Sequence, residues 1–320
     1  MKKAVKIIAV LLAVAIVVSG VLVGIFKKEE INYFFSSMNN AVVAIQDGSW
    51  KEQVNPSNAN KDEAGQLTFT PGTYGSVKFD SQEDVVKYYV DAYNKTKEKT
   101  AKYIDDQGKE QTYYAFLGTE NIVVNSVLVE GKENSIISNL APSIVGGLFS
   151  KNLYGLPPCA NRDPNLDIDE NQDSLIQSRL TAQDIKSCSV KDNGDGTITL
   201  TLMPADVEMS RKGLDSQGKM FNTLGAIDKT VDSISVLSWA SGTTQENCKV
   251  IYENGTATVK IDTASGEIVE ADYKMNVDVN VTHANVTVLK DKSASLNITY
   301  EQHFPADDDY MMKTKGVKKA

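Results

Sequence analysis

The sequence predicts an α+β fold: a curved antiparallel β-sheet, a half-barrel-like meander, packed on a few helices and preceded by one N-terminal transmembrane helix. Three observations lead to this prediction: an uncharged apolar run at 7–26, a helical apolar period at 82–99, and strict apolar–polar alternation at 267–282. The chain has 320 residues, of which 41% are hydrophobic and 23% charged. That composition is ordinary for a globular protein, and the length is sufficient for a large core.

The amino terminus predicts a membrane span. Lys2, Lys3 and Lys6 precede the uncharged run at 7–26, and about 20 helical residues extend roughly 30 Å, the thickness of a bilayer core. A secretory signal peptide cleaved near Ser19 is the competing interpretation. The apolar run continues past Ser19, which favours an uncleaved signal anchor. The lysines keep residues 1–6 cytoplasmic, so either interpretation sends the following domain out of the cell.

Composition divides the rest of the chain. Residues 27–73 are expected to be a juxtamembrane segment and linker, because 47–75 are dense in Asn, Gly, Ser, Thr, Pro and charged residues. An extracytoplasmic α+β domain is expected at 74–305. The end of the chain, 306–320, has an acidic triplet followed by a basic stretch, a composition typical of a disordered tail.

A helix is expected to begin after Ser81, whose hydroxyl can cap the first turn, with acidic residues following it. Apolar and aromatic side chains then recur at helical spacing at Val85, Tyr88, Tyr89, Ala92 and Tyr93. Tyrosines in this pattern favour packing on a sheet over a binding face for carbohydrate. Further helices are expected at 134–149 and 220–236 to help cover the apolar face of the sheet.

The second half of the sequence predicts antiparallel strands joined by short turns at 193–196, 254–255, 263–266 and 290–292. The alternation at 267–282 indicates a long strand with one apolar and one hydrated face. The apolar side is expected to carry Val269, Ala271, Tyr273, Met275, Val277, Val279 and Val281, and to continue after the last turn with Ala294, Leu296, Ile298 and Tyr300.

Three stretches, YYVDAYNKTKEKT, SRLTAQDIKSCSVKDNGDGTITLTLMP and CKVIYENGTATVKIDTASGEIVEADYKMNVDVNV, together resemble a family of secreted or membrane-anchored envelope proteins of Gram-positive gut bacteria. The resemblance covers about residues 80–304. That family has no assigned activity, so the resemblance implies location and fold only. The arrangement of sheet over helix is also similar to the half-barrel of lipoprotein carriers, without a shared motif.

The charge balance excludes nucleic acid as a partner, because 42 acidic against 33 basic residues give a net charge of -9. Only two histidines occur, His283 and His303, which leaves little material for zinc or general-base chemistry. The sequence has no nucleophile elbow, phosphate-binding glycine loop or zinc-protease motif. We therefore expect no catalytic residue and no cofactor.

The acidic stretch at 163–173 is a candidate calcium loop, with potential ligands at Asp163, Asn165, Asp167 and Asp169. An EF-hand also needs glycine at its sixth position and glutamate at its twelfth. Ile168 and Ser174 occupy those positions. The pattern therefore favours a solvated acidic loop, and no metal site is expected.

Cys159, Cys188 and Cys248 lie in the part of the chain expected outside the cell, where disulfides persist. Three cysteines allow one bridge and one remaining thiol. Cys188 and Cys248 each stand at the start of an expected strand, which favours a disulfide between these two.

Two classes of function follow. The first is a non-enzymatic, single-pass membrane protein, or a secreted one if the N-terminal segment is cleaved, that binds an apolar ligand or an envelope partner. A structural or adhesive surface role belongs with it. The alternative is a hydrolase that uses two carboxylates on cell-wall or external glycan, which needs two acids about 5–9 Å apart, one with a raised pKa.

Overall fold

A computed structural model describes residues 67–97, 99–133, 155–158, 177–223, 231–232, 237–286 and 289–320. The expected membrane span at 7–26, the acidic loop at 163–173 and the expected helix at 134–149 lie outside these residues. Among the described helices, none has the length and apolar character needed to cross a membrane.

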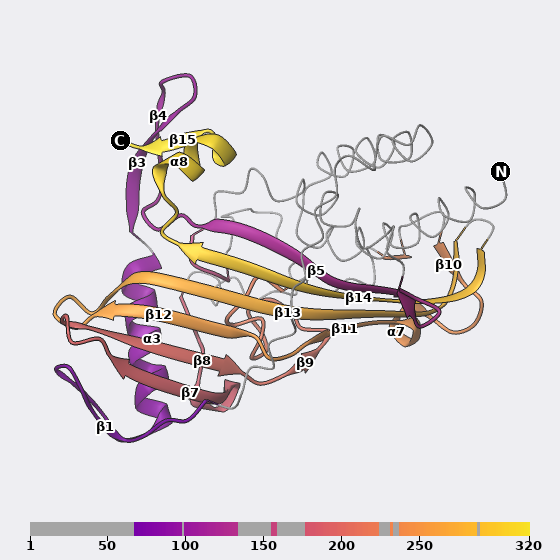
Figure 1. Ribbon diagram of the computed structural model, residues 1–320, viewed down its shortest axis with the longest axis horizontal. Coiled ribbons are helices and arrows are strands. Elements are labelled where there is room, and N and C mark those ends of the chain that lie inside the picture. Colours follow the sequence, from indigo (N-terminus) through magenta and orange to yellow (C-terminus); the bar gives the residue numbers. More distant parts are fainter. Residues whose placement is uncertain are drawn as a thin grey trace.

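The described residues form a sheet-rich α+β structure dominated by one open, ten-stranded antiparallel sheet (Figure 1). The main path runs β6-β5-β14-β13-β12-β8-β7, and β9, β10 and β11 join at its side. The strands are β5 (Thr119–Val129), β6 (Lys132–Glu133), β7 (Ile185–Asp192), β8 (Thr197–Pro204), β9 (Val207–Glu208), β10 (Leu237–Trp239), β11 (Cys248–Tyr252), β12 (Thr256–Asp262), β13 (Glu267–Val286) and β14 (Leu289–Phe304).

Two smaller sheets complete the strands. β1 (Gly72–Tyr74) and β2 (Val77–Phe79) form a hairpin, and β15 (Val317–Lys319) pairs with β3 (Thr100–Asp105), which pairs with β4 (Glu110–Tyr114). The helical elements are α3 (Gln82–Lys97), η2 (Ala182–Asp184), α7 (Thr244–Asn247), α8 (Asp308–Tyr310) and η3 (Met311–Lys315).

Helix α3 confirms the helix expected at 82–99 and defines the two faces of the large sheet. Ser81 Oγ accepts a hydrogen bond from Asp84 N at 3.2 Å, so the expected cap is present. Tyr89 and Tyr93 are buried, and the helix packs on β13, β7 and β8. In Figure 1, α3 crosses behind the strands. We call the sheet face toward α3 the inner face and the opposite face the outer face.

β13 is the central strand of the sheet, with 20 residues. One edge pairs with β14, and the other pairs in succession with β12, β11 and β10. The alternation expected for this strand holds over most of its length, because Met275, Val277, Val279 and Val281 on the inner face are at most 3% exposed.

The prediction of a hairpin turn at 254–255 is wrong. Tyr252 lies opposite Val277, and Thr256 lies opposite Lys274, so β11 and β12 pair with the same edge of β13 and follow one another along it. The segment has one residue more than β13 between these pairs, which makes it a bulge. Asn254 adopts a left-handed φ of 54° there. An Asn-Gly pair supplies this conformation equally for a bulge and for a tight turn.

Val269 does not lie on the inner face as expected. Lys260 is opposite Glu270, but Ile261 is opposite Ile268, so Val269 is the extra residue of a second bulge. The bulge reverses the alternation, and Val269 is 41% exposed while Ile268 is 2% exposed. Ile268 therefore takes the buried position.

The last turn is also placed differently from the expectation at 290–292. Val286 lies opposite Leu289, and residues 290–292 belong to β14 and do not form the turn. The register shifts twice near this end of the hairpin. His283 and Asp291 have left-handed φ values of 53° and 49°, which identifies the polar stretch as part of an irregular ladder and not a turn.

The expected disordered tail at 306–320 is ordered in the structure. Asp307 Oδ1 accepts a hydrogen bond from Tyr310 N at 2.6 Å and caps α8, and β15 adds to the edge of β3. Met311 and Val317 then pack with Tyr103 and Leu117 in a second small core. The apolar residues of this core are spaced among charged residues. The charged composition of the segment therefore gave the wrong prediction of disorder.

Candidate functional site

The outer face of the large sheet carries the polar side chains of the alternating strands. One row crosses five strands, with each residue opposite the next: Thr201, Thr258, Asp272, His303 and Thr119. Residues in cross-strand register lie on the same face with their Cβ atoms about 5 Å apart. The register therefore assembles hydroxyl, carboxylate and imidazole groups from distant parts of the sequence.

Asp272 and His303 are the charged centre of that row. His303 Nδ1 lies 2.8 Å from Asp272 Oδ1, and their side chains are 44% and 58% exposed, respectively. Glu270 is two residues before Asp272 on β13, and alternation puts both side chains on the outer face. One ligand atom from each of the three residues lies within 4.8 Å of the others. We call these three residues the carboxylate–imidazole group.

Two lysines flank this group, and each has a further acidic residue near it in the sheet or its loops. Lys260 is opposite Glu270, and its Nζ lies 3.1 Å from Asp195 Oδ2. Lys274 is opposite Glu301 on β14. The hydroxyl of Thr197 and the ammonium of Lys260 bond to the Asp195 carboxylate and lower its pKa to about 2. The charge of Lys260 is therefore paired with a carboxylate, while Lys274 has an acidic residue opposite it on the neighbouring strand.

Further along β13, amide and hydroxyl side chains form a hydrogen-bonded network. Asn125 Nδ2 donates to Asn297 Oδ1 at 2.7 Å and to Thr299 Oγ1 at 2.8 Å. Asn297 Nδ2 donates to Asp278 Oδ1 at 2.6 Å, and Thr299 Oγ1 donates to Asn276 Oδ1 at 3.0 Å. The network joins β5, β14 and β13, so these polar groups are held in fixed orientations.

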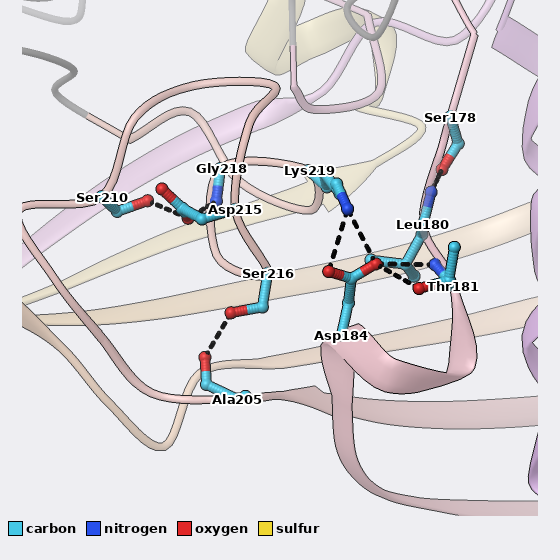
Figure 2. Close-up of polar contacts among 10 residues, drawn as sticks. All are labelled: Ser178, Leu180, Thr181, Asp184, Ala205, Ser210, Asp215, Ser216, Gly218 and Lys219. Atoms are coloured by element: carbon cyan, nitrogen blue, oxygen red, sulfur yellow. Dashed lines mark hydrogen bonds and ion pairs between the residues drawn. The ribbon is translucent and has the colours of Figure 1, made fainter.

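A second polar cluster lies beside the sheet, in the segment after β9 (Figure 2). Asp215 accepts hydrogen bonds from Ser210 Oγ at 2.6 Å, Arg211 N at 2.6 Å and Gly218 N at 2.9 Å. Ser216 Oγ donates to the Ala205 carbonyl at 2.8 Å. These bonds fold the segment on itself, so the cluster has a structural role.

Lys219 connects the same segment to η2. Its Nζ lies 3.0 Å from both carboxylate oxygens of Asp184, which also accepts from Thr181 N and Oγ1 (Figure 2). Of the helix expected at 220–236, residues 220–223 are not helical and residues 231–232 are helical, while 224–230 and 233–236 lie outside the described residues.

The expected disulfide between Cys188 and Cys248 is not formed, and both side chains are buried. Cys188 is in register with Leu202, which is in register with Ala257. Cys248 comes nine positions before Ala257 in the β11–β12 run, which corresponds to about 30 Å along the strand. A disulfide needs Cα atoms within about 7 Å, so the sheet keeps the two thiols apart.

The structure does not test Asp163, Asn165, Asp167 and Asp169 as calcium ligands, because they lie outside the described residues. It does bring together Glu270, Asp272 and His303, a group that the sequence pattern alone does not predict. Part of this group was predictable, because the alternation at 267–282 puts Glu270 and Asp272 on one face of the strand. His303 joins the two acids only through the register of β13 and β14. The turn predicted at 290–292 does not give this register.

No family model, curated protein or solved structure matches the chain.

Proposed function

We propose that the chain is a non-enzymatic binding module, anchored in the cell membrane by residues 7–26, whose extracytoplasmic domain binds a polar envelope partner through the outer face. The resemblance to secreted or anchored envelope proteins supports this location. Of the two partners expected, an apolar ligand is less well supported. The inner-face side chains of β13 from Met275 to Val281 are already buried within the chain.

The observation that carries the proposal is the network of Asn125, Asn297, Thr299, Asn276 and Asp278. Its hydrogen bonds fix polar side chains on three adjacent strands before any partner arrives. A surface that is already ordered loses less conformational entropy on binding, so more of its interaction energy contributes to affinity. Asn297 and Thr299 are themselves only 7% exposed and hold the network together, while Asn125, Asn276 and Asp278 are partly exposed. These partly exposed groups suit a partner rich in hydrogen-bond donors and acceptors.

The alternative of a carboxylate hydrolase has less support. A general acid for glycoside cleavage needs a raised pKa. The carboxyl groups of Asp192, Asp195 and Asp262, at the loops beside the outer face, have lowered pKa values, because hydrogen bonds hold them as anions. Groups stabilised in the charged form are better suited to binding than to donating a proton.

Binding is tested with purified full-length protein in detergent, sedimented with isolated cell envelopes of the source organism. Thr201→Arg and Asn280→Arg add a bulky charge at two separate places on the outer face, and each is expected to weaken sedimentation at least fivefold. Thr112→Arg, on an exposed position of β4, is the matched control and should bind like the unaltered protein. Equal binding by all three variants would contradict the outer face as the binding surface.

Location is tested separately by adding protease to intact protoplasts. The proposed orientation predicts digestion of the domain from about Tyr74 onward, while residues 1–6 stay protected. Protection of the whole domain would contradict the orientation. Recovery of the domain from the culture medium, beginning near Gly20, would show that the segment at 7–26 is cleaved.

A further inference from the structure

We propose that the carboxylate–imidazole group, Glu270, Asp272 and His303, binds a divalent transition-metal ion, with zinc as the representative ion. This inference concerns a metal site on the outer face and does not depend on the identity, or the existence, of an envelope partner.

The backbone supplies the geometry of the proposed site. Glu270 and Asp272 are separated by one residue on β13, and His303 is directly opposite Asp272 on β14. Side chains at i and i+2 of a strand share a face, and a cross-strand partner lies beside them. A rigid ladder therefore presents three ligands from two paired strands, where loop motion does not separate them.

The distances fit metal coordination with small side-chain adjustments. Two atoms bound to one ion at about 2.0–2.2 Å lie about 3.0–3.5 Å from each other. His303 Nδ1 and Asp272 Oδ1 are 2.8 Å apart, and all three ligand atoms lie within 4.8 Å of one another. Rotation of the exposed, flexible Glu270 side chain is sufficient to close the remaining gap.

The ligand types select the class of ion. Imidazole nitrogen favours zinc, copper, nickel and iron, while carboxylate oxygen is accepted by these ions and by calcium and magnesium. Calcium and magnesium prefer sites made entirely of oxygen ligands. One nitrogen with two carboxylates therefore favours a transition metal. Three protein ligands on an exposed face also leave coordination positions for water.

The electrostatic surroundings favour a cation. Within the stretch of outer face that holds the group, Lys260 forms an ion pair with Asp195, and Lys274 lies in cross-strand register with Glu301. These two lysines are therefore offset by two acids. The charges of Glu270 and Asp272 remain available to a bound ion.

The chain contains its own control. His283 Nδ1 lies 2.8 Å from Asp291 Oδ1, and both side chains are exposed. This pair has the same chemistry and distance as His303 and Asp272. Among the described residues, however, only the carboxylate–imidazole group brings three potential ligands together. A difference between the two histidines would therefore isolate the contribution of the third ligand.

The test uses the full-length protein in detergent, stripped of metal with a chelator and titrated with zinc chloride in equilibrium dialysis. One zinc ion per chain is expected. His303→Gln and Asp272→Asn should each weaken binding at least tenfold, and Glu270→Gln at least threefold. His283→Gln should leave the affinity unchanged. Thermal unfolding of each metal-free variant verifies that the substitutions do not unfold the sheet.

Nuclear magnetic resonance of the imidazole groups gives a second readout, because the chain has only two histidines. Zinc should shift the His303 signals and leave those of His283 in place. Equal shifts of both histidines, or unchanged affinity in Asp272→Asn, would overturn the proposal and leave an ordinary His–Asp hydrogen bond. Since neither measurement involves an envelope partner, failure of the proposed function would not affect this result.

Discussion

The hydroxyl oxygens of Tyr89 on α3 and Tyr273 on β13 lie 3.0 Å apart in the core. Both rings are at most 1% exposed, so the hydrogen bond joins the helix to the central strand away from water. Burial raises the pKa of the Tyr89 hydroxyl well above its ordinary value, despite the opposing effect of the bond to Tyr273. The neutral hydroxyl is thus the stable form in the folded protein.

Replacing one of these hydroxyls removes a buried partner from the other. Tyr89→Phe is expected to lower the free energy of unfolding by about 1–2 kcal/mol, because a buried polar group loses a hydrogen bond. The double variant that also carries Tyr273→Phe should lose less unfolding free energy than the two single variants lose in sum. Denaturant unfolding of the four proteins measures this coupling, and strict additivity would argue against the bond.

Cys188 is expected to make the protein less stable in alkali. Burial raises the pKa of its thiol from 9.0 to about 11. Between these values the unfolded thiol ionises while the folded one keeps its proton, so stability is complete below pH 9 and decreases as the pH rises toward 11. In Cys188→Ala, the free energy of unfolding should depend less steeply on pH over this interval. Cys248→Ala should leave the Cys188 contribution in place, and an identical slope with and without Cys188 would contradict the prediction.

Gly255 is expected to tolerate no larger side chain. A Cβ atom there would lie 2.8 Å from the Phe221 ring and 3.2 Å from the Lys274 carbonyl oxygen. Gly255→Ala should therefore destabilise the protein by about 1–3 kcal/mol through overpacking. At Gly72 the same atom would make only ordinary contacts, the nearest at 3.6 Å, so Gly72→Ala is the control in thermal unfolding. Similar stability of the two variants would show that Phe221 moves freely.

Asp215 is expected to protect the segment after β9 from proteolysis. Its carboxylate accepts three hydrogen bonds, from Ser210, Arg211 and Gly218. Asp215→Ala should release the segment and accelerate tryptic cleavage after Arg211 and Lys212 by at least tenfold. Asp91→Ala, on the exposed side of α3, should be cleaved at the unaltered rate. Resistance of Asp215→Ala would mean that packing alone holds the segment.

The sequence was informative wherever local periodicity determines structure. Helix α3 lies where its cap and apolar spacing predict it, and β13 alternates as expected from Ala271 to Val281. These patterns depend on neighbours two to four residues apart, so they do not require the tertiary structure. The sheet-rich α+β class followed from the same signals.

Register was the part that local patterns could not predict. The bulges at Asn254 and Val269 and the pairing of Val286 with Leu289 depend on strand pairing across the whole sheet. A polar dipeptide is compatible with a bulge or a turn, and only the partner strand distinguishes them. Because the register of β13 and β14 was not predicted, His303 could not be placed opposite Asp272. The candidate metal site therefore could not be predicted from the sequence.

The pairing of β14 with β5 has a consequence for the order of folding. His303 and Thr119 face each other from positions 184 residues apart, whereas β13 and β14 are neighbours in sequence. Closing a long loop costs more entropy than closing a short one, so non-local strands add slowly. We expect the β13–β14 hairpin to form before the rate-limiting barrier and β5 to dock after it. Val279→Ala should then slow refolding, while Val127→Ala should mainly accelerate unfolding, as measured by stopped-flow fluorescence. The reverse pattern would mean that the two ends of the chain meet first.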